Sequence, residues 1–297
     1  MTGQARIGRA RIGRARIRRI AGAALLLALG ACTAIERAAL PAPVLTDPGW
    51  ASYSPGSPRR VDHAAWDRFL ATYRRLGSDG IARIDYGAVT PQDHAALKAY
   101  VAALGAEDVA ALDRPAQLAF WINLYNAVTV DLVLDAYPVD SIRTVGAGLL
   151  PTRPWDAPVV TVGDKPLSLN DIEHAIVRPI WQDARVHYAF NCAAAGCPNL
   201  GETAYRGATV EALLDRNARA YVNDPRGLRD EDGRLVASRI YAWFREDFGG
   251  SDAGVLAHAR RYAEPPLAAR LRGATRIDRF AYDWTLNDTA NGPVAVR

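Results

Sequence analysis

The sequence lacks most of the short motifs that identify an enzyme from sequence alone. No glycine-rich phosphate loop follows a predicted strand, and neither G-x-S-x-G nor H-E-x-x-H occurs in the 297 residues. The D-F-G at 247–249 has none of the surrounding protein-kinase motifs, so we assign it no role. These absences argue against a P-loop nucleotide enzyme, a serine hydrolase of the α/β type and a zinc protease.

Cysteine is also scarce, with three residues at positions 32, 192 and 197. The last two form C-x4-C rather than C-x-x-C, which argues against a thioredoxin-type oxidoreductase. They also lack the second ligand pair that makes a zinc pattern specific. Basic charge is scarce beyond the N-terminus. Residues 1–31 carry seven arginines and no acid, and without them the net charge of +4 becomes −3, so no nucleic-acid partner is expected.

The first 31 residues are expected to be a signal peptide. Arginine-rich residues 6–19 precede an apolar run, 20–31, that is too short to span a bilayer. The run ends in L-G-A-C, which resembles the cleavage site of bacterial lipoproteins, with Cys32 as the lipidated first residue. We expect a lipid bilayer as partner and a periplasm-facing position in the cell envelope. Thr33 in place of aspartate favours the outer membrane over the inner, and a plain secreted protein is the alternative.

Residues 32–60 are rich in Ala, Pro and Ser and are expected to be a tether, followed by one globular domain over 61–297. Helices are predicted from Asp62, over about 115–137, from Ser168, over about 209–222, after Ser238 and over 254–261. Hairpins are predicted at 159–167 and 228–236, and strands at 185–191 and 277–284. The pattern predicts a helix-rich α+β domain, with the nearly buried central helix 115–137 packed on a small, mostly antiparallel sheet.

The central helix carries two asparagines on an otherwise apolar surface. Projected at 100° per residue, Asn123 and Asn126 lie among apolar side chains, away from the polar stripe of Gln117, Asp131 and Asp135. Buried amides need hydrogen-bond partners. The two residues therefore either pin a neighbouring loop backbone or contact a ligand directly.

The segment S-L-N-D-I-E-H-A-I-V-R, residues 168–178, begins with a capping box of Ser168 and Asp171. The same projection puts Glu173 at the edge of the apolar face and His174 about 100° further round. A carboxylate on an apolar face must find a cation or a donor, or keep its proton. Glu173 is therefore either a site residue or a structural ion pair with an arginine such as Arg143 or Arg185, and His174 is either a surface histidine or part of the site.

The segment R-V-H-Y-A-F-N-C-A-A-A-G-C-P-N-L, residues 185–200, holds His187, Cys192 and Cys197. Two cysteines five apart in an exported loop can form a disulfide. Alternatively, Cys192 is a thiolate nucleophile that a histidine activates. A transition-metal site on the histidines and Glu173 is a third, weaker hypothesis, and no metal or other cofactor is otherwise indicated.

In the nucleophile hypothesis, polar side chains from distant segments share one site with Cys192. The histidine that takes its proton is His187 or His174, the group that orients the histidine is Glu173 or Asn126, and Asn123 donates to an oxyanion.

Five segments occur in an order and spacing that resemble the family known as domain of unknown function 547. They are W-I-N-L-Y-N-A (121–127), Y-P-V-D-S-I (137–142), the segment 168–178, R-V-H-Y-A-F-N-C (185–192) and G-C-P-N-L (196–200). The terminal Y-D-W-T-L-N, 282–287, is similar to bacterial members, and the resemblance covers about residues 62–290. It departs from the family at C-P-N-L, where C-P-P-L is usual.

The resemblance implies that the positions of Asn123, Asn126, Glu173, His174, His187 and Cys192 belong to the family's pattern. A serine can stand in some members where Cys197 stands here, which weighs against the disulfide. Two functions fit this set of residues. One is a thiol-dependent hydrolase or acyl transferase acting on peptide, other amide or ester bonds. The other is a non-catalytic envelope binding lipoprotein with a polar pocket for a cell-wall or peptide ligand and a loop disulfide.

Overall fold

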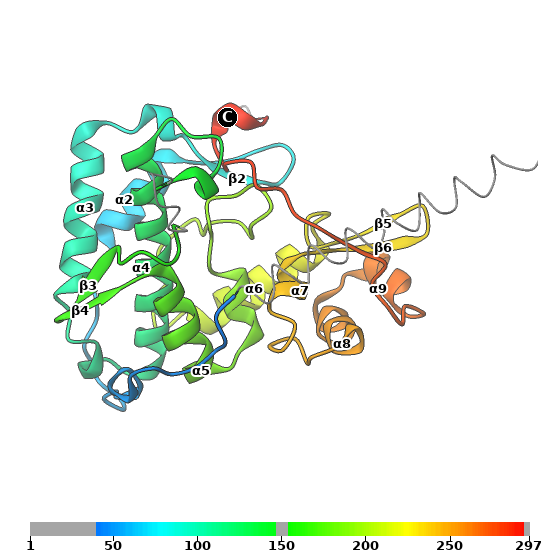
Figure 1. Ribbon diagram of the computed structural model, residues 1–297, viewed down its shortest axis with the longest axis horizontal. Coiled ribbons are helices and arrows are strands. Elements are labelled where there is room, and N and C mark those ends of the chain that lie inside the picture. Colours follow the sequence, from blue (N-terminus) through cyan, green and yellow to red (C-terminus); the bar gives the residue numbers. More distant parts are fainter. Residues whose placement is uncertain (1–39, 147–153, 294–297) are drawn as a thin grey trace, which may run out of the picture. The chain divides into compact units, whose positions relative to one another are not determined.

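The computed structural model describes residues 40–146 and 154–293, and all structural statements refer to these (Figure 1). The helices are α2 (Ala64–Tyr73), α3 (Pro91–Gly105), α4 (Arg114–Ala136), α5 (Arg178–Trp181), α6 (Val210–Asn223), α7 (Ile240–Trp243), α8 (Asp252–Tyr262) and α9 (Pro265–Leu271). The strands are β1 (Arg74–Leu76), β2 (Ala82–Ile84), β3 (Val160–Val162), β4 (Lys165–Leu167), β5 (Leu228–Glu231), β6 (Arg234–Ser238) and β7 (Arg279–Ala281). The predicted helix-rich α+β class is confirmed.

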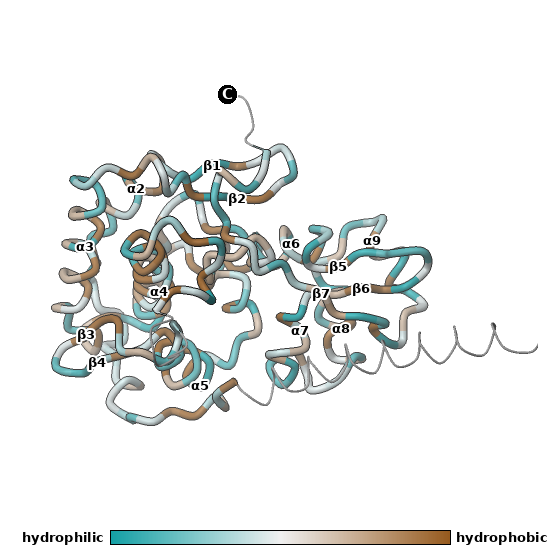
Figure 2. Tube along the Cα trace, turned by 45° about the horizontal axis from the view of Figure 1, so that its top comes forward, coloured by the Kyte–Doolittle hydropathy of each residue, from teal (hydrophilic) through white to brown (hydrophobic). Residues whose placement is uncertain are grey.

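Helix α4 is the central buried helix that the sequence predicts. The side chain of Asp113 accepts a hydrogen bond from the Ala116 amide, and Pro115 in the first turn fits a helix start. Among the described helices, α4 alone is long and apolar enough to cross a membrane, but 83% of its apolar window is buried inside the protein, as in a core helix. Figure 2 shows α4 as a largely hydrophobic coil next to α2 and α3.

The strands form three small sheets, which are mostly antiparallel as predicted. β1 pairs with β2 and β3 with β4, both antiparallel, and β6 lies between antiparallel β5 and parallel β7. Both predicted hairpins are present, because each depends on a local turn, at Gly163 and at Asp232-Gly233, where the backbone has positive φ.

The strand predicted at 185–191 is wrong. Its first residues form a 3₁₀-helix, η6 (Ala184–Tyr188), capped by Asp183, whose side chain accepts from the Arg185 amide. Residues 186–191 are all buried, so the alternation of apolar residues does not mark one face of a sheet. Val186 and Phe190 belong to the apolar cluster around α4, whereas Tyr188 belongs to a second cluster formed by the 218–277 part of the chain. Two apolar side chains of η6 that lie two residues apart, Val186 and Tyr188, thus pack in two different hydrophobic clusters.

The part of the predicted tether from Pro41 onward packs against the domain. The Val44 amide donates to the His174 carbonyl, the Ser54 amide donates to the Leu112 carbonyl, and Trp50 packs edge-on against Trp121 with ring centroids 5.3 Å apart. A segment that supplies backbone hydrogen bonds and an aromatic contact is part of the fold, whatever its proline content. The predicted signal peptide and the lipidation residue Cys32 lie outside the described residues.

Candidate functional site

The predicted site residues Glu173 and His174 lie on a π-helix, η5 (Asp171–Val177), which continues into α5. The predicted capping box is present: the Asp171 side chain accepts from the amide and hydroxyl of Ser168, and the Asp171 amide donates to the Ser168 hydroxyl. The Arg178 amide then donates to the Glu173 carbonyl, five residues back. This wider turn buries Glu173 and His174 together, which a projection at 100° per residue could not anticipate.

His187, from η6, lies between two carboxylates. Its Nε2 is 2.7 Å from Oδ2 of Asp247, and its Nδ1 is 3.4 Å from Oε1 of Glu173. The ring stacks on Phe244, with centroids 3.9 Å apart and an 11° interplanar angle. Nδ1 is buried and, among the described residues, has no hydrogen bond, so its contact with Glu173 is electrostatic.

Arg178 completes the network on the other side of Asp247. Its Nε and Nη2 donate to the two oxygens of Asp247 at 2.7 and 3.1 Å, and its Nη1 donates to Nδ1 of His174 at 2.8 Å. This bidentate geometry is the strong form of an arginine–carboxylate pair. A chain of contacts through Glu173, His187, Asp247, Arg178 and His174, all buried except the partly exposed Asp247, thus joins three segments of the sequence.

The electrostatics of the chain follow from burial and from these contacts. Burial raises the pKa of Asp247, but the hydrogen bonds from His187 and Arg178 outweigh it and hold the pKa well below the ordinary range. Burial lowers the pKa of His174 to about 4, so His174 is neutral near pH 7 and can accept from Arg178.

Glu173 remains ionised although it is buried. Burial raises its pKa, whereas His174, His187 and Arg178 together lower it, and the net direction is below the ordinary value. Since His174 is neutral near pH 7, Arg178 is the permanent cation among these three groups. Arg178 is already paired with Asp247, so the charge of Glu173 is less completely matched than that of Asp247.

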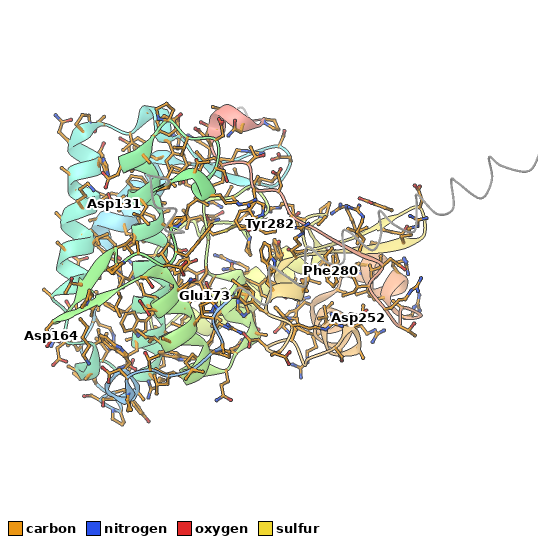
Figure 3. All side chains as sticks on the ribbon, in the orientation of Figure 1. Asp131, Asp164, Glu173, Asp252, Phe280 and Tyr282 are labelled. Atoms are coloured by element: carbon orange, nitrogen blue, oxygen red, sulfur yellow. A yellow bond between two sulfur atoms is a disulfide. The ribbon has the colours of Figure 1, made fainter. Side chains whose placement is uncertain are left out.

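Aromatic side chains lie next to Glu173. Burial, followed by the charge of Glu173, raises the pKa of Tyr125 well above its ordinary value. Tyr282 is close enough that the same charge also raises its pKa, after burial, and Figure 3 shows Glu173 and Tyr282 in the same central region. Around them lies a set of partly exposed rings in mutual contact, which we call the aromatic cluster: Trp155, Trp243, Tyr282 and Trp284.

Asn123 and Asn126 pin backbone and do not reach the charged chain. Asn123 donates to the carbonyl of Tyr205 and accepts from its amide, at 2.8 and 2.9 Å. Asn126 donates to the carbonyl of Ala189 and accepts from the amide of Asn191, also at 2.9 and 2.8 Å. Of the two alternatives left open by the sequence, the structure has the backbone clamp, so the oxyanion and orienting roles given to these residues are corrected.

Cys192 and Cys197 form a disulfide, with their Cα atoms 6.4 Å apart. Cys192 therefore has no thiol in this state. Both sulfurs contact the hydroxyl of Tyr282, at 3.1 and 3.0 Å, and among the described residues no histidine is hydrogen-bonded to either sulfur. The nitrogens of His187 face carboxylates and Nδ1 of His174 faces Arg178, so the predicted thiolate–imidazole pair is absent from this part of the chain.

The hypothesis of a metal site on Glu173, His174 and His187 finds no support in the described residues. There the sole group whose ligand atoms gather within 4.8 Å is His94, Asp131 and Asp135, and Lys98 already pairs with both of these aspartates. The Lys98 ammonium already supplies the positive charge that a metal ion would bring to these two aspartates.

Asp247 is the main site residue that the sequence analysis missed. It belongs to the D-F-G that we set aside, and it contacts His187 from 60 positions along the chain. The role of Arg178 could have been predicted from the sequence. It lies one helical turn after His174 in the segment 168–178, and this spacing brings two side chains together.

Comparison with known proteins gives one match. Residues 109–222 match the model of a family described as "Protein of unknown function, DUF547". The matched span contains α4, η5, η6 and both cysteines, but not Asp247 or Tyr282. No curated protein and no solved structure matches the chain.

Proposed function

We propose that this protein, whose residues 109–222 match the DUF547 family model, binds a ligand with an ammonium or guanidinium group at Glu173. The observation that carries the proposal is an ionised carboxylate, 9% exposed, beside partly exposed aromatic rings. A carboxylate can accept several hydrogen bonds, and aromatic faces attract cations. A peptide with a free amino group, as in cell walls, has this chemistry.

The charge balance of the site supports a cationic ligand. Asp247 is matched by bidentate Arg178, while Glu173 has His187 at 3.4 Å and no hydrogen bond from it. A ligand cation would pair with Glu173, on the side of this network of charged residues where the aromatic cluster lies. The Asp247–His187 contact fixes the orientation of the His187 ring beside Glu173.

Binding of matched peptides tests the proposal. An Nα-acetylated lysine peptide and its Nε-acetylated form differ in one ammonium group, which is the only ammonium group that either peptide can carry. We expect the charged peptide to bind, with a change in tryptophan fluorescence from the aromatic cluster, and Glu173→Gln to weaken binding about tenfold or more. Glu211→Gln, at an exposed glutamate on α6, is the control and should bind as the wild type does. Equal binding of both peptides, or full binding by Glu173→Gln, would refute it.

A second candidate is the thiol-dependent hydrolase or acyl transferase acting on amide or ester bonds. It is favoured by the local geometry of Cys192, which is partly exposed and is followed by Ala193 with φ of 58°, a strained conformation for a residue other than glycine. The disulfide must first be reduced. Reduced protein should then cleave a thiol-reactive ester, Cys192→Ala and Cys192→Ser should abolish the cleavage, and Cys197→Ser should retain most of it.

The cell-envelope location belongs to the proposal as well, and it rests on the N-terminal sequence. Cys32→Ala should release the protein from the membrane fraction and remove incorporation of labelled fatty acid. Membrane attachment that persists in this variant would contradict lipidation at Cys32.

A further inference from the structure

The two cysteines of the disulfide differ in their access to solvent. Cys192 is partly exposed, whereas Cys197 is 2% exposed. A thiolate arriving from solvent therefore meets the sulfur of Cys192 first, and the sulfur of Cys197 becomes the leaving group. This asymmetry is the first requirement for a disulfide that exchanges at one defined sulfur.

Donors surround the sulfur that would leave. The amide of Cys192 donates to Sγ of Cys197 at 3.1 Å, and the hydroxyl of Tyr282 lies 3.0 Å from the same sulfur. Sulfurs in a disulfide carry no hydrogen, so the hydroxyl is the donor. Burial raises the pKa of Tyr282 well above its ordinary value, which keeps that proton in place. A thiolate formed on Cys197 would be stabilised by both donors.

A cation lies on the same side of the loop. Arg226 donates through Nη1 to the carbonyls of Ala195 and Cys197, at 3.2 and 3.0 Å. The charge of Arg226 lowers the pKa of Tyr282, whereas the charge of Glu173 raises it. Arg226 also pairs with Asp224, at 2.8 and 2.9 Å, so its contribution to the loop is the pair of hydrogen bonds to these carbonyls.

Contacts other than the disulfide also hold the loop. Asn191 accepts from the Ala193 amide at 2.9 Å and donates to the Pro198 carbonyl at 2.8 Å, so one side chain clamps both ends. The amide of Gly196 donates to the Asp283 carbonyl, and this approach requires glycine, because a Cβ there would lie 2.8 Å from the Asp283 nitrogen. The two sulfurs would stay close after cleavage and could pair again.

From this geometry we propose that Cys192–Cys197 is a redox-active disulfide that exchanges with a partner carrying two neighbouring thiols. A partner thiolate attacks Sγ of Cys192, a partner–Cys192 disulfide forms, the Cys192–Cys197 bond breaks, and Cys197 leaves as a thiolate with the electron pair. The second partner thiolate attacks the partner sulfur of that mixed disulfide and releases Cys192 as a thiolate. This protein gains two electrons and the partner becomes a disulfide.

The proposal does not depend on ligand binding at Glu173. The absence of C-x-x-C argues against a thioredoxin-type enzyme, but exchange itself needs an accessible sulfur and a stabilised leaving group, and both are present in C-x4-C.

Native-state reduction tests which sulfur reacts. The folded protein is treated with millimolar dithiothreitol, alkylated with iodoacetamide and digested for mass spectrometry. We expect Cys192 to be alkylated about tenfold faster than Cys197. With oxidised glutathione, reduced Cys197→Ser should form a mixed disulfide at Cys192, and Cys192→Ser should form almost none at Cys197. A disulfide that is reduced only after denaturation, or equal labelling of both cysteines in the wild type, would overturn the proposal without need of either variant.

Tyr282→Phe tests the leaving-group donor. The variant keeps the ring in the aromatic cluster but removes the hydroxyl, and we expect dithiothreitol to cleave its disulfide about tenfold more slowly. A merely looser loop would be cleaved faster, so the sign separates the donor role from a structural one. Tyr100→Phe removes a buried hydroxyl bonded to His63 and should keep the wild-type rate. A wild-type or faster rate in Tyr282→Phe would show that the hydroxyl does not assist.

Discussion

Replacing Asp247 by alanine should destabilise the fold more than any single change on the protein surface. The substitution removes the acceptor of three hydrogen bonds, from Nε2 of His187 and from Nε and Nη2 of Arg178. The Arg178 side chain is 5% exposed, so its charge would stay buried without a carboxylate. Breaking a buried pair in this way costs about 3–5 kcal/mol, which is roughly 6–20 °C in melting temperature for a domain of this size.

Asp247→Asn gives the pH dependence of the same contact. The pKa of Asp247 is lowered in the folded protein, so the unfolded chain binds the proton more readily at low pH. Its contribution is therefore complete above the unfolded pKa of about 3.9 and is lost as the pH falls below that value. The difference in unfolding free energy between wild type and Asp247→Asn should be constant from pH 7 to pH 5 and should shrink below about pH 4.

Urea denaturation at several pH values measures both effects. The control is Asp215→Asn, which removes an exposed aspartate from the surface pair with Arg185 and should cost less than about 1 kcal/mol at any pH. If Asp247→Ala melts within about 2 °C of the wild type, or if the Asp247→Asn difference does not change between pH 7 and pH 3, the buried network does not carry the energy assigned to it.

Two further predictions concern residues outside the charged chain. Asn126→Ala would leave a buried carbonyl and a buried amide of the 189–191 backbone without hydrogen-bond partners. We expect the unfolding free energy measured in urea to fall by roughly 2–5 kcal/mol, and peptide binding by the folded fraction to stay unchanged. Lost binding at full stability would contradict the role of Asn126 as a backbone clamp. Burial lowers the pKa of His63 to about 4, so the free energy of unfolding should fall as the pH drops from about 6.5 towards 4. In His63→Gln this fall should be smaller by about 3 kcal/mol. The same pH dependence in the variant and the wild type would refute the prediction.

Local signals explain the parts of the fold that could be predicted. The capping box at Ser168, the turn at Gly163 and the proline at the start of α4 each act within a few residues of their own position. The elements that depend on them, the helix from 168, the hairpin β3–β4 and α4 itself, were predicted correctly. Helices α3 and α9 were not predicted, although each begins with a proline at its first turn.

The segment whose apolar side chains pack in two separate hydrophobic clusters, η6, was predicted wrongly. Alternating apolar residues usually mean a strand with one buried face. In η6 the alternation arises because Val186 packs in the cluster around α4 and Tyr188 packs in the second cluster, with His187 buried between them. Nothing in the sequence of the segment distinguishes these two situations, since the second core is built by residues that follow much later in the chain.

The candidate site shows the same division between local and distant information. A carboxylate on an apolar face must find a cation or a donor, or keep its proton, but the ion pair that we predicted between Glu173 and Arg143 or Arg185 is not present in the described part of the chain. Arg185 pairs with acids at the surface, at Asp183, Glu211 and Asp215, and Arg143 lies over the ring of Trp284. The pairing was decided by a carboxylate from another part of the chain.

Asp247 determines which residues of the site can act, because it holds both Arg178 and Nε2 of His187. Its two oxygens take the Arg178 fork, and Oδ2 also holds Nε2 of His187, so Glu173 is left with one buried ring nitrogen that is not hydrogen-bonded. The ionised carboxylate with spare accepting capacity is therefore the one beside the aromatic cluster, not the one at the arginine. Removing Asp247 would also remove the acceptor that holds Nε2 of His187, whose ring lies beside Glu173. We therefore expect Asp247→Ala to lose peptide binding even in its folded fraction, whereas Asn126→Ala would not.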